Sequence, residues 1–154
     1  MALFGKDKEA PHIVRVGVVG YSGQKFDETK AKELLHGAFE KIHQQWPHSI
    51  IVVVSGYTDL GIPALAYREA KSRGWKTAGI ACSKAKDYAC FDCDYVEIVG
   101  SDWGQESETF LNSIDVFVRI GGGGQSKRET ATFKEMIKAK EKVFIQEFEL
   151  LAIQ

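Results

Sequence analysis

The sequence has no long apolar run. No stretch approaches the ~18 residues of a membrane span, and the opening segment, MALFGKDKEAPH, lacks the apolar core of a signal peptide. We therefore expect a cytoplasmic protein with no membrane contact. Cysteine is also scarce: Cys82, Cys90 and Cys93 cannot all pair within one chain. Because a chain of this size needs no disulfides, we expect reduced thiols.

Neither sign of charge is in excess. The chain has 20 Lys and Arg against 21 Asp and Glu, a net charge of -1, so nucleic acid is not an expected partner. Its 154 residues, 44% hydrophobic and 27% charged, have the composition of an ordinary globular domain. We expect a polar tail over residues 1–12 and a single domain over residues 13–154.

Three familiar site motifs are missing. Gly20 and Gly23 form only G-x-x-G, which is short of the dinucleotide fingerprint G-x-G-x-x-G, and the P-loop motif G-x-x-x-x-G-K-[ST] does not occur. Cys90 and Cys93 have the C-x-x-C spacing of zinc and redox sites, but no second close pair accompanies them. We therefore expect no metal site and no dinucleotide cofactor.

Nearly continuous apolar runs alternate with helical patterns along the chain, which is typical of parallel strands joined by crossover helices. Asp27 is a plausible N-cap for the clearest helix, which ends before Pro47. The other expected helices cover 63–73, 106–113 and 128–140. The expected strands cover 13–20, 49–54, 76–81, 95–99, 115–120 and 142–146. Regular alternation predicts an α/β fold, a three-layer Rossmann-like sandwich with a mainly parallel sheet of about six or seven strands and helices on both faces.

Glycine is the informative excess, and glycine-rich loops follow three of the expected strands: 20–23, 55–61 and 121–126. Ligands bind such sheets beyond the carboxyl ends of the strands, so we expect these loops to converge on one rim. The candidate ligand-binding residues are Gly20, Tyr21, Ser22, Gly23, Ser55, Gly56, Thr58, Asp59, Gly61, Trp103, Gly121, Gly122, Gly123, Gly124, Gln125 and Ser126.

The four consecutive glycines at 121–124 are the strongest single signal, because ordering them costs entropy that a simple turn would avoid. Amides in such a loop, followed by a helix N-terminus, favour a phosphate or nucleotide cradle over a loose exposed turn. Trp103 either stacks on a base or plugs the sheet end. Thr58 and Asp59 either bind ribose hydroxyls or form turns and caps.

The segments GYSG, SGYTDLGIPALA and IGGGGQSKRET, each following or ending a strand, resemble the SLOG superfamily of Rossmann-like nucleotide-binding proteins. That superfamily includes DprA/Smf domains, LOG phosphoribohydrolases and molybdenum cofactor carrier proteins. The LOG motif P-G-G-x-G-T-x-x-E aligns with this chain so that Gly121, Gly122 and Gly124 match its glycines. Arg128 then occupies the glutamate position, and Glu129 lies one residue later. The family arginine has no counterpart in SDWGQESETFLNS.

The resemblance implies a protein that binds a nucleotide or another phosphate-bearing ligand, as a carrier or sensor. The ligand would be AMP-like or molybdopterin-like. The alternative is a LOG-like nucleoside 5′-monophosphate N-glycosidase in which Glu129 is the catalytic residue; a DprA-like nucleic-acid-binding domain fits the neutral charge least. The family also implies a homodimer or higher homo-oligomer. The apolar residues within 147–154 either cover the sheet or meet another subunit.

Overall fold

The structure, a computed structural model, describes residues 12–139, 142 and 144–153. It contains one six-stranded sheet in the order β4-β3-β2-β1-β5-β6, and all neighbouring strands are parallel. The strands are β1 (Ile13–Gly20), β2 (Ile50–Ser55), β3 (Lys76–Ala81), β4 (Tyr95–Ile98), β5 (Val116–Ile120) and β6 (Phe144–Phe148). The strand order reverses between β1 and β5, which places the topological switch point between these two strands.

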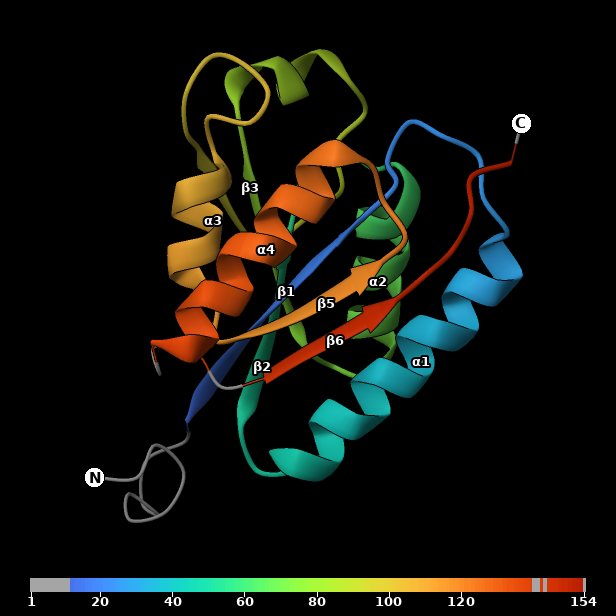
Figure 1. The fold of residues 1–154 in the computed structure, drawn as a ribbon, viewed down its shortest axis with the longest axis vertical. Coiled ribbons are helices and arrows are strands. Elements are labelled where there is room, and N and C mark those ends of the chain that lie inside the picture. Colours follow the sequence, from blue (N-terminus) through green and yellow to red (C-terminus); the bar gives the residue numbers. More distant parts are fainter. Residues whose placement is uncertain (1–11, 140–141, 143, 154) are drawn as a thin grey trace.

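The helices lie on both faces, so the predicted three-layer Rossmann-like sandwich is confirmed (Figure 1). The helices α1 (Glu28–Gln45) and α2 (Gly61–Ser72) cover one face, against Val14, Val16 and Val18 of β1. The helices α3 (Ser107–Ser113) and α4 (Gly124–Lys138) cover β1 and β5 on the other face. The apolar runs of β1 and β5 thus form strands that are largely buried on both faces, as is typical of parallel sheets.

Local signals fix several element ends. Asp27 is the N-cap of α1, as predicted, and its carboxylate accepts a hydrogen bond from the amide of Lys30 at 3.0 Å. Gly74, just beyond α2, has a φ of 74°, the left-handed conformation that commonly follows a helix. At Gly17 a Cβ would lie 2.4 Å from Cδ1 of Ile114, so glycine lets the end of α3 pack directly on β1.

The start of α4 differs from the prediction. The helix begins at Gly124, four residues before the expected start at 128, with Gly123 as its N-cap. Because glycine has a low helix propensity, the sequence favoured a loop through all four glycines. The helix nevertheless begins at the fourth glycine, directly after the turn that follows β5. β6 ends at Phe148 instead of 146. Residues 1–11 of the expected tail, residue 140 of the expected helix and residue 143 of the expected strand lie outside the described residues.

Part of one sheet face carries no helix within the described chain. The connection from β3 to β4 contains only a short 3-10 turn, η1 (Ser83–Asp87), so a hollow of about 530 Å³ lies over β2, β3 and β4 beside α3. Tyr95 and Val96 on the edge strand are exposed there. Phe148 at the end of β6 and Leu150 beyond it pack against the core formed with α1 and α2.

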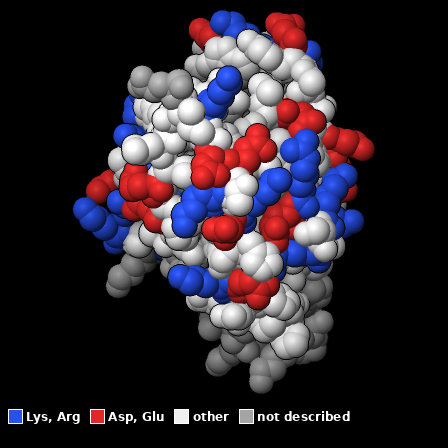
Figure 2. All heavy atoms as spheres, turned by 90° about the vertical axis from the view of Figure 1, so that its right-hand side faces the viewer, with Lys and Arg blue, Asp and Glu red and all other residues white. Residues whose placement is uncertain are grey.

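The surface shown in Figure 2 carries basic and acidic side chains interspersed, with no stripe of one sign. Ion pairs join neighbouring elements; Nη1 of Arg73, for example, lies 2.9 Å from Oε1 of Glu40 and links the end of α2 to α1. This face has none of the clustered basic charge that holds nucleic acid. No helix in the described part of the chain is long and apolar enough to cross a membrane.

Candidate functional site

A cavity of about 370 Å³ lies at the carboxyl ends of the strands, above the switch point between β1 and β5. The loops after β1, β2 and β5 all reach it, together with the loop before α3. The expected site residues that line it are Gly20, Tyr21, Ser22, Gly23, Ser55, Gly56, Thr58, Trp103, Gly123, Gly124, Gln125, Ser126 and Glu129. Loops distant in sequence therefore meet at one rim.

Four expected site residues do not line the cavity. Asp59 pairs its Oδ1 with Nη2 of Arg68 at 2.9 Å. Gly61 opens α2 with a φ of 57°, and a Cβ there would lie 2.1 Å from the carbonyl oxygen of Tyr21. Gly121 and Gly122 form the turn beneath the rim. These four residues help to shape the loops around the cavity but do not line it.

The turn after β5 is held rigidly. Gly121 has a φ of 59° and Gly122 a φ of 102°, both in the region that favours glycine. The amide of Gly121 donates to the carbonyl oxygen of Phe148 at 2.8 Å, and Nη1 of Arg119 donates to the carbonyl oxygen of Gly121 at 2.8 Å. At Gly122 a Cβ would lie 2.6 Å from Oγ of Ser126. The first two glycines thus set the direction in which α4 leaves the strand.

The other two glycines open α4 at the cavity. Gly123 is the N-cap and no side chain caps the helix there. The first amides of a helix have no carbonyl partner within it, and the helix dipole adds partial positive charge. Gly124, Gln125 and Ser126 provide such amides on the cavity wall. A Cβ at Gly123 would meet nothing within 4 Å, so this wall is open to an incoming group.

Two carboxylates also line the cavity, Glu129 on α4 and Glu106 just before α3. Oε2 of Glu129 accepts from Oγ of Ser107 at 2.7 Å and from Nε2 of Gln125 at 3.3 Å. Nε2 of Gln125 also lies 3.2 Å from Oε2 of Glu106, whose Oε1 accepts from the amide of Gly104 at 2.9 Å. Burial raises the pKa of Glu129, and the hydrogen bonds from Ser107 and Gln125 oppose that rise.

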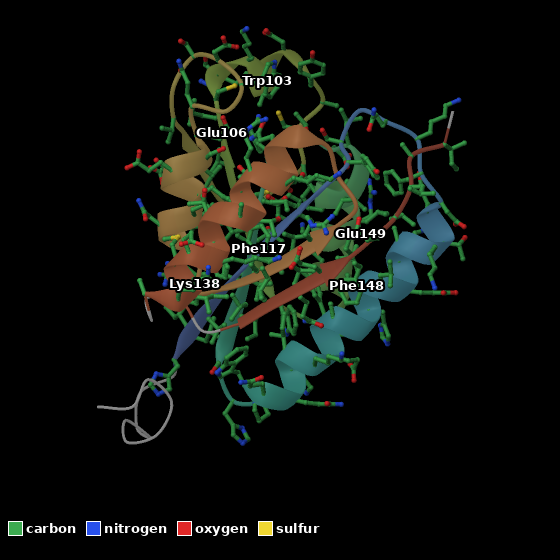
Figure 3. All side chains as sticks on the ribbon, viewed as in Figure 1. Trp103, Glu106, Phe117, Lys138, Phe148 and Glu149 are labelled. Carbon is green, nitrogen blue, oxygen red and sulfur yellow. The ribbon has the colours of Figure 1, made fainter. Side chains whose placement is uncertain are left out.

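No Lys, Arg or His is among the described residues that line the cavity. Lys127 and Arg128, in the first turns of α4, lie outside that lining. Trp103 stands at the mouth with 48% of its surface exposed, and its ring meets Tyr88 edge to face with 5.9 Å between centroids. It therefore does not plug the sheet end. Figure 3 shows Trp103 and Glu106 at this end of the sheet, beside the start of α4.

Sequence reasoning missed several lining residues, most of them apolar or aromatic: Val18, Val19, Gln24, Tyr57, Pro63, Ile80, Ala81, Ala85, Glu106 and Phe110. Val19 and Ile80 lie near the carboxyl ends of their strands, so their place in the lining could have been predicted from the strand bounds once the rim was located. Glu106 had a usable signal, because it follows the loop after β4 at the same edge. Its pairing with Glu129 through Gln125 required the structure.

The cysteines lie apart from the cavity lining. All three are free; Cys82 is buried, and Cys90 and Cys93 are partly buried. Burial raises the pKa of Cys93 to about 11. Within the described residues no group of three or more His, Cys, Asp and Glu is placed to hold a metal ion.

Solved structures share this architecture. TM1055, a structural genomics target, matches with a TM-score of 0.64 and 21% identity over 80% of this chain and 69% of that chain. The molybdenum cofactor carrier protein MCP from Chlamydomonas reinhardtii matches with a TM-score of 0.62 and 23% identity over 88% of this chain and 79% of that chain. The chain shares the α/β, Rossmann-like fold of these structures. No protein-family model and no curated protein matches the sequence.

The structure brings Glu129 to the cavity lining. The motif alignment put Arg128 at the glutamate position, yet Glu129 lines the cavity and Arg128 does not. One helical residue turns a side chain by roughly 100°, so the early start of α4 decides which of the two points inward. The cavity wall contributed by α3 offers Phe110 and no cation, with Glu106 just before the helix.

Proposed function

We propose that this protein binds a small phosphate-bearing ligand in the cavity, as a carrier or sensor, with a nucleoside monophosphate or a molybdopterin-like compound as the ligand. The observation that carries the proposal is the open start of α4 at Gly123 and Gly124, where unpaired amides line a cavity at the sheet's switch point. The volume of about 370 Å³ falls in the range of small-molecule sites.

The phosphate is expected at the amide wall. Without a cationic side chain in the described lining, the helix dipole and the backbone amides must supply the favourable electrostatics. The aromatic rings at the mouth, Tyr57 and Trp103, suit a planar group that extends from the phosphate. A carrier role agrees with the name of the molybdenum cofactor carrier protein that shares the fold.

Hydrolysis of the glycosidic bond is the alternative, with Glu129 as the acid or base. Cleavage needs a positioned acid-base pair and stabilisation of the developing charge. Here the carboxylate is held by Ser107 and Gln125, and no arginine or lysine stands beside it in the cavity lining. Binding without turnover is therefore the function that the geometry supports best.

Calorimetric titration with AMP tests the proposal, with adenosine as the matched ligand that lacks the phosphate and ribose 5-phosphate as the one that lacks the base. We expect AMP to bind at least tenfold more tightly than adenosine, and ribose 5-phosphate to compete. Chromatography of the same mixtures detects free adenine. Release of base would support the hydrolase, and binding without release supports the carrier.

The variant Gly123→Val places a side chain in the open wall, where nothing lies within 4 Å of the added Cβ. We expect AMP affinity to fall at least tenfold while the free energy of unfolding changes by less than about 1 kcal/mol, the scale of a cap substitution. Gly122→Val is the less suitable variant, because its φ of 102° strains any other residue. Unchanged affinity in Gly123→Val would show that the cradle is misplaced.

A further inference from the structure

Trp103 is an exposed aromatic residue on the lining of the cavity. It is 48% exposed, on the loop between β4 and α3, whereas Trp46 and Trp75 lie in or against the core formed with α1 and α2. Figure 3 places Trp103 at the carboxyl end of the sheet, beside the start of α4. A tryptophan ring has a large apolar face, so an indole in this position can bind a flat group of a ligand.

An ion pair holds the loop that carries Trp103. Oδ1 of Asp102 accepts a hydrogen bond from Nζ of Lys84 at 2.7 Å and another from the amide of Trp103 at 2.8 Å. The bond from Lys84, followed by the bond from the amide, lowers the pKa of Asp102, so this carboxylate stays charged at neutral pH. Because Lys84 belongs to η1, the pair fastens the loop to the neighbouring connection between β3 and β4.

Gln105 supplies a second support for the loop. Its Oε1 accepts from the amide of Ser101 at 2.8 Å and from the amide of Asp102 at 3.2 Å. At Gly100, which has a φ of 79°, a Cβ would lie 2.6 Å from that same oxygen, so the close approach requires glycine. All five amides of residues 101–105 have an acceptor within the loop and the start of α3. The backbone that presents the indole is therefore ordered before a ligand arrives.

The indole itself is restrained by a second ring. Tyr88 meets Trp103 edge to face with 5.9 Å between centroids, and Tyr88 lies outside the cavity lining. The contact limits the rotation of the indole and leaves it on the lining of the cavity. A ring that is already held in place loses less conformational entropy when a ligand binds, so more of the contact energy appears as affinity.

We propose that Trp103 determines which ligands the cavity selects: a bicyclic conjugated ring stacks on its indole while the phosphate of the same molecule occupies the amides of α4. Asp102 and Gln105 are the positioning residues for that indole. This inference rests on the proposed function. Stacking recognises the face of a ring and strengthens with the area of overlap, so a ring of purine or pterin size binds better than a single ring or a bare sugar.

Calorimetric titration of the unaltered protein with AMP, UMP and ribose 5-phosphate measures the contribution of the ring. We expect AMP to bind at least fivefold more tightly than ribose 5-phosphate, because stacking on an aromatic side chain contributes roughly fivefold or more per base. AMP should also bind at least twofold more tightly than UMP, whose base has one ring. AMP should quench tryptophan fluorescence, and Trp103→Phe should abolish the quenching because Trp46 and Trp75 lie outside the cavity lining.

The variant Trp103→Leu keeps an apolar side chain and removes the ring. It should lower the affinity for AMP at least fivefold and leave the affinity for ribose 5-phosphate within twofold, which also shows that the phosphate site is still folded. Trp103→Phe keeps a smaller ring and should lose less than Trp103→Leu. Tyr95→Leu is the matched control, because Tyr95 is 60% exposed on β4 and lies outside the cavity lining. It should change neither affinity.

The positioning role of Gln105 is tested by the ratio of the two affinities. Gln105→Leu removes the acceptor for two amides of the loop and should lower the ratio of AMP to ribose 5-phosphate affinity at least threefold. Gln105→Glu keeps an oxygen in that place and should restore the ratio, since its added charge acts on the phosphate of both ligands. Equal ratios in the two variants would contradict the positioning role.

The outcomes separate the ring site from the phosphate site. If AMP and ribose 5-phosphate bind equally tightly, or if Trp103→Leu and Tyr95→Leu behave alike, stacking on Trp103 is wrong and the phosphate site stands. If adenosine binds as tightly as AMP and ribose 5-phosphate does not bind, the phosphate site is wrong and the loss of adenosine binding in Trp103→Leu still supports stacking. If AMP, adenosine and ribose 5-phosphate all fail to bind the unaltered protein, both proposals are overturned.

Discussion

The guanidinium of Arg119 donates from Nη1 to the carbonyl oxygen of Gly121 at 2.8 Å, so a strand residue fixes the turn that opens α4. Arg119 is almost fully buried, at 4% exposed, and its Nη2 pairs with Glu147, 3.3 Å away, and with Glu149. The hydrogen bond to Glu149 raises the pKa of Arg119. One buried cation thus ties β5, the glycine turn and the end of β6 together.

Arg119→Met should destabilise the fold and weaken ligand binding. The substitution leaves the carbonyl of Gly121 without its side-chain donor, and an acceptor that loses its donor in a buried position costs about 1–3 kcal/mol. Urea unfolding gives the stability, and titration with AMP gives the affinity. Lys134→Met is the control, because Lys134 pairs with the same Glu147 at 2.6 Å but is half exposed, and it should cost about 1 kcal/mol or less. Equal losses in the two variants would contradict the role given to Arg119.

Glu129→Gln should become more stabilising, relative to the unaltered protein, as pH rises. Burial raises the pKa of Glu129 above its ordinary value of 4.5, with a smaller contribution from Glu106 that Arg128 opposes. The stability that the protonated carboxyl contributes is therefore fully present below about 4.5, the unfolded value, and is lost as pH rises through the folded value. Glutamine mimics the protonated form at every pH.

The measurement for Glu129→Gln is the free energy of unfolding in urea between pH 4 and pH 8, with Glu108→Gln as the exposed comparison. A difference from the unaltered protein that grows with pH only for Glu129→Gln is the expected result. A difference that stays flat across this range would mean that the carboxyl is not destabilised by its burial.

Cys93 should react slowly with iodoacetamide at pH 8. Its pKa is raised to about 11, first by burial, so only about one thiol in a thousand is ionised at that pH, and the thiolate is the reactive form. Mass spectrometry of peptides after timed alkylation gives the rate. In urea the same residue should react at the rate of an ordinary cysteine, and equal rates in both states would contradict the predicted protection.

Gly37→Ala should stabilise the protein by about 0.5–1 kcal/mol, the usual cost of glycine within a helix. Gly37 lies within α1 on its exposed side, and an added Cβ would meet nothing within 4 Å. Thermal and urea unfolding measure the gain, and AMP affinity should not change because the helix lies away from the cavity lining. A loss of stability would indicate a contact that the open surface does not show.

The strands were the most predictable part of the molecule. β1 and β3 have the predicted bounds. β1 in particular is a nearly continuous apolar run that ends at Gly20, which is typical of a strand buried on both faces. Convergence of the loops follows from the fold class, since parallel strands end on the same edge. The start of α4 was not predictable in this way, because the low helix propensity of glycine indicates a loop where the structure has the first residue of the helix, Gly124.

The pair of carboxylates was the least predictable part of the site. Glu106 lies just before α3 and Glu129 lies on α4, so their proximity depends on how α3 and α4 pack. A shift of one residue in the start of α4 would have turned Arg128 inward in place of Glu129. The partly uncovered sheet face also escaped prediction, because the β3–β4 connection is long enough for a helix yet forms only η1.

The strand pair at the centre of the sheet joins distant parts of the chain, since Val16 of β1 pairs with Val116 of β5. Contacts between residues so far apart form late in folding, because the entropy of closing the intervening loop must be met first. The cavity lies at the end of this pair, so the ligand site is complete only when the native pairing has formed. A bound ligand would then act chiefly by slowing unfolding, with little effect on the rate of folding.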